Sequence, residues 1–535
     1  MTEKIFIPAF ISKMVGVFQV KVTEERSVVD DDNKITVNHV IGKVALIYEK
    51  LRNVVDYNDE HLLRKNAIFR ILKRLLLIER RRETLGLQLL QELIRINYLP
   101  NNTLPESRAE EVDALLQKYL LVGEIIDRHY RSRPGSKFHT WFLEIAACEI
   151  EEALFDFRQR NALASAMVRV LKRDLALPDN INERDQDLLL HVAVLRSLFK
   201  SDEVIIYYYL LSEVYPEFFG GQPSAAVVEK LIQHWPRVRV RLDYYLYHPL
   251  RHKLNKIGRK YAVYFAILRD TLLEHPDEID TLIRHPKMLA DKLIETCDHR
   301  YREIRIKVIR SVIRSVLYLF ITKMALALLI EVPVDYLLES AINYTTLVIN
   351  ILFPPVLMLL ISLFIRLPKK QNTEKIIEEV KGIVYQRAGD EPKFHIRLHT
   401  ASRGLVNFFF NLFYLITYGI SFGLVIWFLI RLDFNILSGA IFIFFLSLVS
   451  FFALTIRGRA RELIVLDSRE GFINMIFDFF SLPIVRFGRW LSVKLSKVNV
   501  FVFMLDFVIE APLKLILAVV ERWFSFVREK KEEIY

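Results

Sequence analysis

The chain has very little cysteine. Of its 535 residues only Cys148 and Cys297 are cysteines, and they stand far apart in the sequence. A disulfide framework or a zinc centre needs several such residues at short spacing. The sequence therefore excludes a disulfide-stapled fold and a cysteine-ligated zinc site, and we expect two ordinary reduced thiols.

The chain also lacks the short motifs that mark common enzymes. It contains no phosphate-binding glycine loop, dinucleotide-binding turn, paired-histidine zinc helix or serine nucleophile elbow. His248-Pro249, His275-Pro276 and His285-Pro286 could suggest metal ligands, but no second set of histidines or carboxylates accompanies them at metal spacing. Proline suits the first position of a helix, so these pairs are typical of helix starts. We expect a non-enzymatic protein with no metal and no cofactor.

Long alternating strand patterns are missing as well. From about residue 58 to residue 310 the sequence repeats amphipathic helical stripes with start signals, such as Ser107 followed by Glu110. Only Val204–Leu211 would suit a strand, because it is a short apolar run rich in aromatics. The sequence predicts an all-α protein with a cytosolic helical domain over residues 1–305.

Long apolar runs, by contrast, are present. The chain is 52% apolar and still 26% charged, with mean hydropathy +0.23, so the two kinds of residue must be segregated. A membrane-crossing helix needs about 20 mostly apolar residues. The candidates are Ser311–Ile330, Ala341–Ile365, Leu405–Ile430 and Phe434–Ile456. We expect a four-span domain over 306–456, entered by one long helix that begins near Pro286.

The charges of the connecting segments predict an orientation. Loops on the cytoplasmic side are rich in lysine and arginine. The segment before the first span and the connection 366–404 are strongly basic, whereas the first connection holds Glu331, Asp335 and Glu339 without a basic residue. We expect a multi-pass protein of the plasma or inner membrane, with 366–404 as a cytosolic loop and both termini in the cytoplasm.

The region 457–535 is expected to form amphipathic helices that lie at the membrane surface or re-enter the membrane. A helix starting at Pro483 would have one apolar face and a basic remainder, which is typical of helices in the headgroup plane. Two further spans, giving six in all, would place the same basic residues on the outer side. With a net charge of +11, we expect anionic lipid headgroups and no nucleic acid as partner. The predicted surface-binding residues are Arg486, Arg489, Lys494 and Lys497.

Ionisable residues at membrane depth are functional candidates, because burying charge in lipid is costly. Lys323 lies inside the first predicted span. Asp506, Glu510 and Lys514 recur every four residues in an apolar stretch, so on one helix they would share a stripe. The four residues form a candidate ion or proton relay, and a solvated helix face is the alternative for the last three.

Two further features of the spans concern their backbone. Pro354 and Pro355 are expected to kink or break the second span, which would free carbonyl groups. Gly419 and Gly423 stand at the spacing that lets membrane helices approach closely, so we expect helix packing there.

The sequence favours a membrane-anchored adaptor or scaffold, whose cytosolic helical domain engages a protein partner. The alternative is a transporter or channel component that uses the intramembrane charges. A lipid-modifying enzyme is a remote third hypothesis. A homo-oligomer is compatible with each of them.

Overall fold

The computed structural model describes residues 6–24, 34–37, 60–78, 84–130, 136–219, 221, 223–339, 344–363, 365, 368, 370–385, 393–396, 404–466 and 472–497. In this part of the chain nearly every element is a helix, which confirms the predicted all-α fold. The described residues form two compact units. The first contains the residues up to Arg284 with 383–385 and 393–396, and the second contains 285–382 and 404–497.

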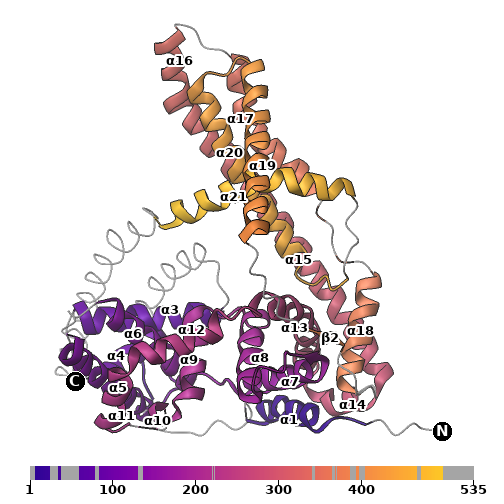
Figure 1. Cartoon of the computed structure of the whole chain (residues 1–535). Coiled ribbons are helices and arrows are strands. Elements are labelled where there is room, and N and C mark those ends of the chain that lie inside the picture. Colours follow the sequence, from indigo (N-terminus) through magenta and orange to yellow (C-terminus); the bar gives the residue numbers. More distant parts are fainter. Residues whose placement is uncertain are drawn as a thin grey trace, which may run out of the picture. The chain divides into compact units, whose positions relative to one another are not determined.

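The first unit is a packed set of amphipathic helices (Figure 1). In chain order its helices are α1 (Ala9–Glu24), α3 (Glu60–Lys73), the π-helix η1 (Arg74–Ile78), α4 (Leu85–Arg95), α5 (Ser107–Tyr130), α6 (Lys137–Leu154), α7 (Arg158–Asp174), α8 (Glu183–Ser197), α9 (Glu203–Val214), α10 (Pro216–Phe219), α11 (Ala225–Gln233), α12 (Trp235–Leu246), α13 (Arg251–Glu274), η2 (Pro276–Glu278) and α14 (Ile279–Arg284).

Local capping explains where several of these helices begin. The side chain of Asn182 accepts a hydrogen bond from the Asp185 amide at 2.8 Å and starts α8. Asp202 accepts from the Ile205 amide at 3.0 Å and starts α9. The strand suggested for Val204–Leu211 is therefore wrong, because this run is the body of α9. A capped start and a buried apolar side outweigh the strand propensity of its aromatic residues.

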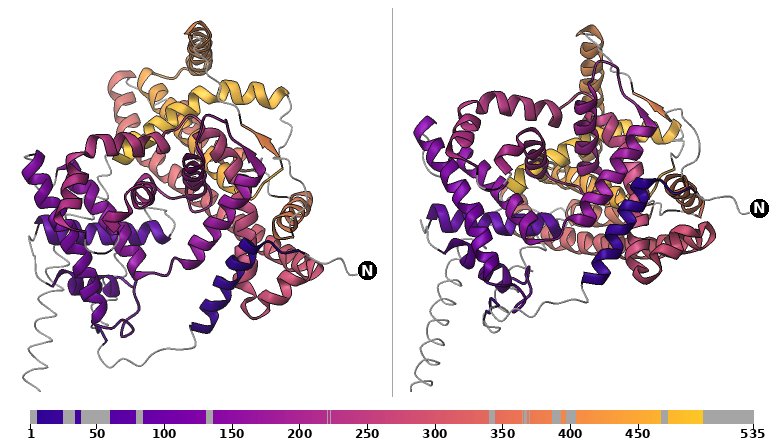
Figure 2. Two further views of the ribbon diagram at one scale, coloured as in Figure 1. Left: turned by 60° about the horizontal axis from the view of Figure 1, so that its bottom comes forward. Right: turned by 90° about the horizontal axis from the view of Figure 1, so that it is seen from below.

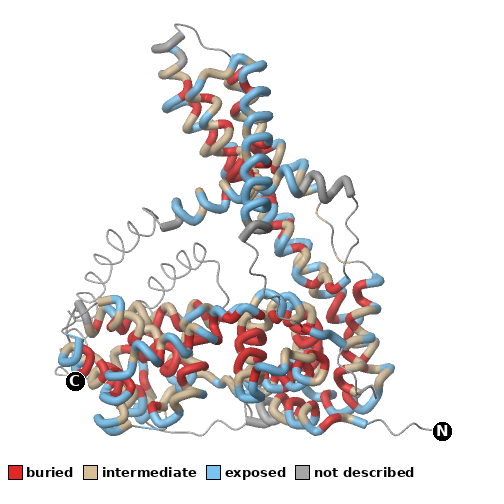
Figure 3. Tube along the Cα trace, viewed as in Figure 1, coloured by how far each residue is buried: buried red, intermediate tan, exposed pale blue. Residues whose placement is uncertain are grey.

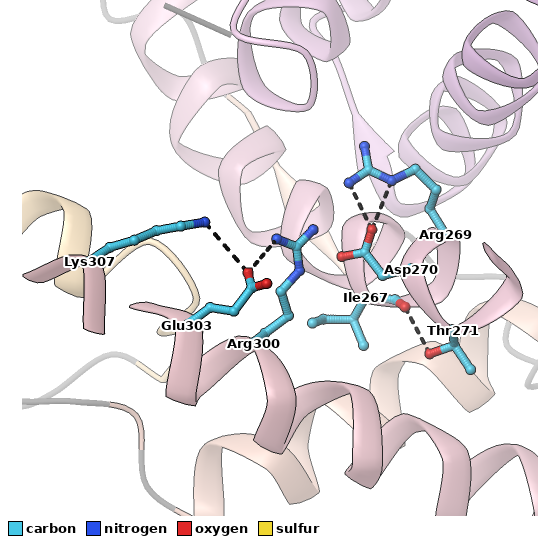
Figure 4. Close-up of polar contacts among 7 residues, drawn as sticks. All are labelled: Ile267, Arg269, Asp270, Thr271, Arg300, Glu303 and Lys307. Atoms are coloured by element: carbon cyan, nitrogen blue, oxygen red, sulfur yellow. Dashed lines mark hydrogen bonds and ion pairs between the residues drawn. The ribbon is translucent and has the colours of Figure 1, made fainter. Parts of the chain in front are cut away.

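The helices of the first unit enclose an apolar core. Figure 3 shows the buried residues on their inner sides. The N-terminal helix α1 packs against α7 and, more lightly, against α14, as the views of Figure 2 show. On α13, Arg269 pairs with Asp270 at 2.8 Å, and the Thr271 hydroxyl donates to the Ile267 carbonyl of the same helix at 2.9 Å (Figure 4).

One short parallel pairing joins distant parts of the sequence within this unit. Strand β1 (Leu175–Ala176) pairs with β2 (Phe394–His395), and the Ile396 amide donates to the Ala176 carbonyl at 2.9 Å. Beside the pair, the Tyr261 hydroxyl donates to Asp174 at 2.6 Å. The segment that follows the second span thus contributes an edge to the helical unit.

The second unit contains the long apolar helices. Its elements are α15 (Pro286–Leu326), the π-helix η3 (Ala327–Glu331), α16 (Val332–Glu339), α17 (Tyr344–Leu363), α18 (Lys370–Val384, whose last two residues belong to the first unit), α19 (Gly404–Arg431), α20 (Ile436–Ala460) and α21 (Phe472–Lys497).

Four helices are long and apolar enough to cross a membrane: Pro286–Val334, Tyr344–Leu363, Phe408–Arg431 and Ile436–Ala460. They correspond to the four apolar runs of the sequence, which indicates a membrane protein. As expected, the first helix begins at Pro286 and continues without a break into its apolar part. Pro276 likewise opens η2, whereas Pro249 lies in a turn two residues before α13 begins at Arg251, so the expectation holds for two of the three His-Pro pairs.

The membrane helices meet along one apolar seam. Residues from α15, α17 and α20 form its core: Val308, Val312, Leu319, Met358, Phe445, Val449, Ala453, Ile456 and Ala460. In the apolar part of α15 and in α17 and α19, most of the exposed residues are apolar, and Figure 3 marks the exposed positions in pale blue. A surface of that kind suits lipid rather than water.

Helix α21 runs across α19 and α20 (Figure 1). It continues through Pro483, so the helix start expected at that proline is wrong and the helix begins at Phe472. At the crossing, Gly488 lies against Ser447 of α20, and any side chain at position 488 would clash with the Ser447 carbonyl oxygen. Glycine is therefore required for this close contact.

Candidate functional site

Lys323 is fully buried between the membrane helices and carries an ion pair. Its Nζ lies 2.5 Å from Oε1 of Glu331, and both side chains are at most 1% exposed. The Nζ also lies 5.0 Å from the centroid of the Phe445 ring on α20. The charge that the sequence marked as a candidate is thus compensated inside the bundle.

Asn350 of α17 completes this buried cluster. Its Nδ2 donates to Oε2 of Glu331 at 2.7 Å and lies 3.4 Å from the Ser438 carbonyl oxygen. Lys323, Glu331, Asn350 and the Ser438 carbonyl thus join α15, η3, α17 and α20 through polar contacts. We call Lys323, Glu331 and Asn350 the intramembrane triad.

The sequence analysis found Lys323 but missed its partners. It placed Glu331 in the first connection, whereas the helix continues through η3 and α16 to Glu339. Lys323 and Glu331 are eight residues apart, and a π-helical turn precedes the glutamate. In a regular α-helix that spacing turns the two side chains about 80° apart, so periodicity alone does not predict the pair.

One acceptor in the triad has no partner. Oδ1 of Asn350 is buried and receives no hydrogen bond from a described residue, although the side chain is 0% exposed. The main-chain carbonyl of Asn350 also lacks the usual helical donor, because the residue four positions on is Pro354. Unpaired acceptors in a dry site are unfavourable, so this residue has unused binding capacity.

The two prolines do not break the second span. Pro354 and Pro355 lie inside the continuous helix α17, and both are buried. Neighbouring helices can accommodate a proline in a membrane helix, so only the carbonyl groups lose their donors. The expected helix break is therefore wrong, because both prolines lie within one continuous helix.

The other predicted relay residues, Asp506, Glu510 and Lys514, lie outside the described residues. Lys323 is therefore the one predicted relay member that the structure describes, and its contacts are with Glu331 and Phe445.

The predicted surface-binding residues lie on α21. Arg486, Arg489 and Lys494 are exposed, and Lys497 is the last residue of the helix, with its side chain outside the description. Arg486 donates to the Tyr414 hydroxyl of α19 at 3.0 Å. The basic side chains therefore line a helix that crosses two apolar helices.

The two glycines of α19 have no close neighbour. A Cβ built on Gly419 or Gly423 would meet no atom within 4 Å, and both residues are exposed. The described chain packs nothing closely onto them, and the helix packing expected there stays a prediction. The close approach that the structure does contain is at Gly488, which the sequence analysis did not select.

The first unit contains a second candidate site. A cavity of about 710 Å³ opens between α6, α7, α8 and α9, and we call it the four-helix groove. At one end Lys172 pairs with Asp187 at 2.9 Å, and Arg184 donates to the Glu213 main-chain oxygen at 3.3 Å. Arg169, also at the lining, is exposed and makes no ion pair or hydrogen bond with a described residue.

The other end of the four-helix groove is more enclosed. There Glu151 and Arg160 line the cavity together with the buried Cys148. Burial raises the pKa of Glu151 to about 7, although Arg64 at 3.2 Å and Arg160 act in the opposite direction. Burial, with Arg160 and Arg64, lowers the pKa of the nearby His61 to about 4. No sequence pattern predicts this groove, because its walls come from four separate helices.

Comparisons with known proteins assign no family or function to the chain. No family model matches the chain, and no curated protein or solved structure shows significant similarity to it. The function must therefore be argued from the two sites themselves.

A double-mutant cycle should detect the interaction between Lys323 and Glu331. At pH 8, Lys323→Met or Glu331→Gln leaves one buried charge without its partner, and each should lower the free energy of unfolding by about 3 kcal/mol or more. The double variant should lose clearly less than the sum of the two. Thermal unfolding of the detergent-solubilised protein measures this, with the exposed Ile321→Met as control. Additive losses would show that the pair contributes nothing as a pair.

Glu151 should give the first unit a distinct pH dependence. A carboxyl whose pKa rises on folding stabilises the fold below its unfolded pKa, and this stability is lost as pH rises through the folded value. Compared with Glu151→Gln, the wild type should lose about 3 kcal/mol between pH about 4.5 and about 7. Unfolding curves across that range test this, with the exposed Glu110→Gln as control. A constant difference between the curves of wild type and Glu151→Gln would contradict it.

Proposed function

We propose that the protein is a membrane-anchored scaffold whose helical first unit binds a protein partner in the four-helix groove. The observation that carries this proposal is the groove itself, a cavity of about 710 Å³ with ionic and aromatic walls. Its volume lies within the range of ligand-binding pockets, and its lining is rich in ionisable and aromatic side chains.

The side chains of the groove are better suited to binding a peptide than to catalysing a reaction. Acidic and basic side chains line it in similar numbers; Lys172 pairs with Asp187, and Glu152 accepts a hydrogen bond from the Tyr208 hydroxyl. Tyr208 and Tyr209 supply aromatic surface, and Arg169 supplies a free cation. Tyrosine and arginine are the residues most enriched where proteins bind partners. No nucleophile paired with a base lines this cavity, so the described groove offers no support for catalysis.

The arrangement in the membrane is part of the same proposal. Basic segments flank the membrane helices on one side, which supports a multi-pass protein with its N-terminus in the cytoplasm. The exposed Arg486, Arg489 and Lys494 on α21 support contact with anionic headgroups. In this arrangement the first unit stands in the cytoplasm, where it meets its partner.

A photo-crosslinking experiment tests the scaffold function. A photoreactive amino acid at Ser165, an exposed groove position on α7, should form an adduct with one partner in cells, and the same group at Gln117 of α5 should not. Arg169→Glu should reduce the Ser165 adduct by about tenfold, because it reverses the charge of a groove cation that pairs with no described residue. An identical adduct pattern from both positions, or no effect of Arg169→Glu, would reject a partner in the groove.

A second candidate is a transporter or channel component. The unpaired Oδ1 of Asn350 favours it, since transporters place free oxygens of this kind beside charged groups at membrane depth. Under this proposal the intramembrane triad would hold the transported or coupled ion.

Flux measurements test the second candidate. In reconstituted vesicles the double variant Lys323→Met with Glu331→Gln should abolish a proton- or ion-dependent flux, because both charges of the site are gone. Lys307→Met, an exposed change on the same helix, should leave the flux unaltered. Equal flux in wild type and double variant would remove the triad from any transport mechanism.

A further inference from the structure

We propose that Glu331, with Asn350 beside it, is an intramembrane proton-binding site. The inference goes beyond the scaffold function and does not rest on it. It starts from one observation, the buried Oδ1 of Asn350 that no described residue satisfies.

The unpaired oxygen belongs to an amide that already contacts the carboxylate. Nδ2 of Asn350 donates to Oε2 of Glu331 at 2.7 Å. A primary amide carries its oxygen on the same planar group as its N–H, so the two can form two parallel hydrogen bonds to one carboxyl group. With an ionised carboxylate only the N–H bond is made, because a carboxylate has no donor for the amide oxygen. A protonated carboxyl group has that donor.

When Glu331 is protonated, its carboxyl group can therefore donate to Oδ1 of Asn350, which has no partner when Glu331 is ionised. A hydronium ion of the aqueous phase supplies the proton that adds to Oε1 of Glu331 and is left as water, and the hydrogen bond from Lys323 Nζ to that oxygen breaks. The new O–H donates to Oδ1 of Asn350, while the bond from Nδ2 to Oε2 remains. The site gains one proton, and the buried acceptor gains its partner.

Lys323 can keep its charge in this state. Its Nζ lies 5.0 Å from the centroid of the Phe445 ring, and an aromatic face stabilises an ammonium group. The ionised and protonated states of the site thus each have partners within the bundle, as expected for a group that exchanges a proton at membrane depth.

Few other titratable groups lie near Glu331; Asp335 and Glu339 of α16, the next carboxyl groups along the chain, have side chains outside the described residues. The sequence of α17, Tyr344–Leu363, contains no charged residue, and α20 contains none before Arg457. On α15 and η3 the charged residues nearest the site are Lys323 and Glu331 themselves. Among the described side chains around the triad, Glu331 is the one carboxyl group that can take up the proton.

Infrared difference spectra between pH 8 and pH 5 test the proposal on the full-length protein in lipid vesicles. The wild type should gain a carboxylic-acid carbonyl band that Glu331→Gln removes. Asn350→Leu should shift this band and weaken proton binding by about tenfold, which corresponds to the loss of one hydrogen bond. The matched control is Glu303→Gln on α15, whose carboxylate pairs with Arg300 and Lys307 (Figure 4), and it should leave the Glu331 band in place.

A second comparison covers the case in which Asn350→Leu does not fold. Gln at position 331 can form both hydrogen bonds to Asn350, whereas Met of similar length can form neither, and both remove the same charge. Glu331→Gln should therefore have a higher thermal midpoint than Glu331→Met. The proposal is overturned if Glu331→Gln removes no carboxylic-acid band, or if Asn350→Leu changes neither the position of that band nor the pH at which it appears. It is also overturned if the Gln and Met variants unfold at the same temperature. The crosslinking test of the groove is independent of each of these results.

Discussion

The membrane unit depends on the ion pair between Lys323 and Glu331. Two charges at 1% exposure or less would be highly unfavourable alone, so each holds the other in place. Because Asn350 binds the same carboxylate and also approaches the Ser438 carbonyl, the pair fixes α15, α17 and α20 in one register. Apolar packing along these helices is less specific, since lipid chains are as apolar as the side chains they would replace.

Much of the fold could be predicted from the sequence, because its strongest signals are long. Each apolar run of about 20 residues became a helix that can cross a membrane, and proline marked the start of α15. Short signals were less reliable. Val204–Leu211 resembles a strand, yet Asp202 caps it as a helix, and Pro483 proved to lie inside α21. In both places tertiary packing decided between local alternatives.

The candidate sites were harder to predict, because they depend on contacts between distant residues. Lys323 could be selected from its charge alone, but Glu331 appeared to belong to a loop and Asn350 is a neutral residue in an apolar run. Gly488 was overlooked for a similar reason, since its role depends on where α21 crosses Ser447. The four-helix groove has no sequence signal at all, because each helix contributes only part of its lining.

The pairing of β1 with β2 has a consequence for how the protein is made. Strand β1 can pair only after residues 394–395 have been synthesised. Two of the helices that can cross a membrane lie between β1 and β2 in the sequence. On the ribosome, the first unit therefore cannot finish folding before that much of the membrane part has been synthesised. A fragment ending at Arg284 would lack its second strand, so this unit is less autonomous than its place at the beginning of the chain suggests.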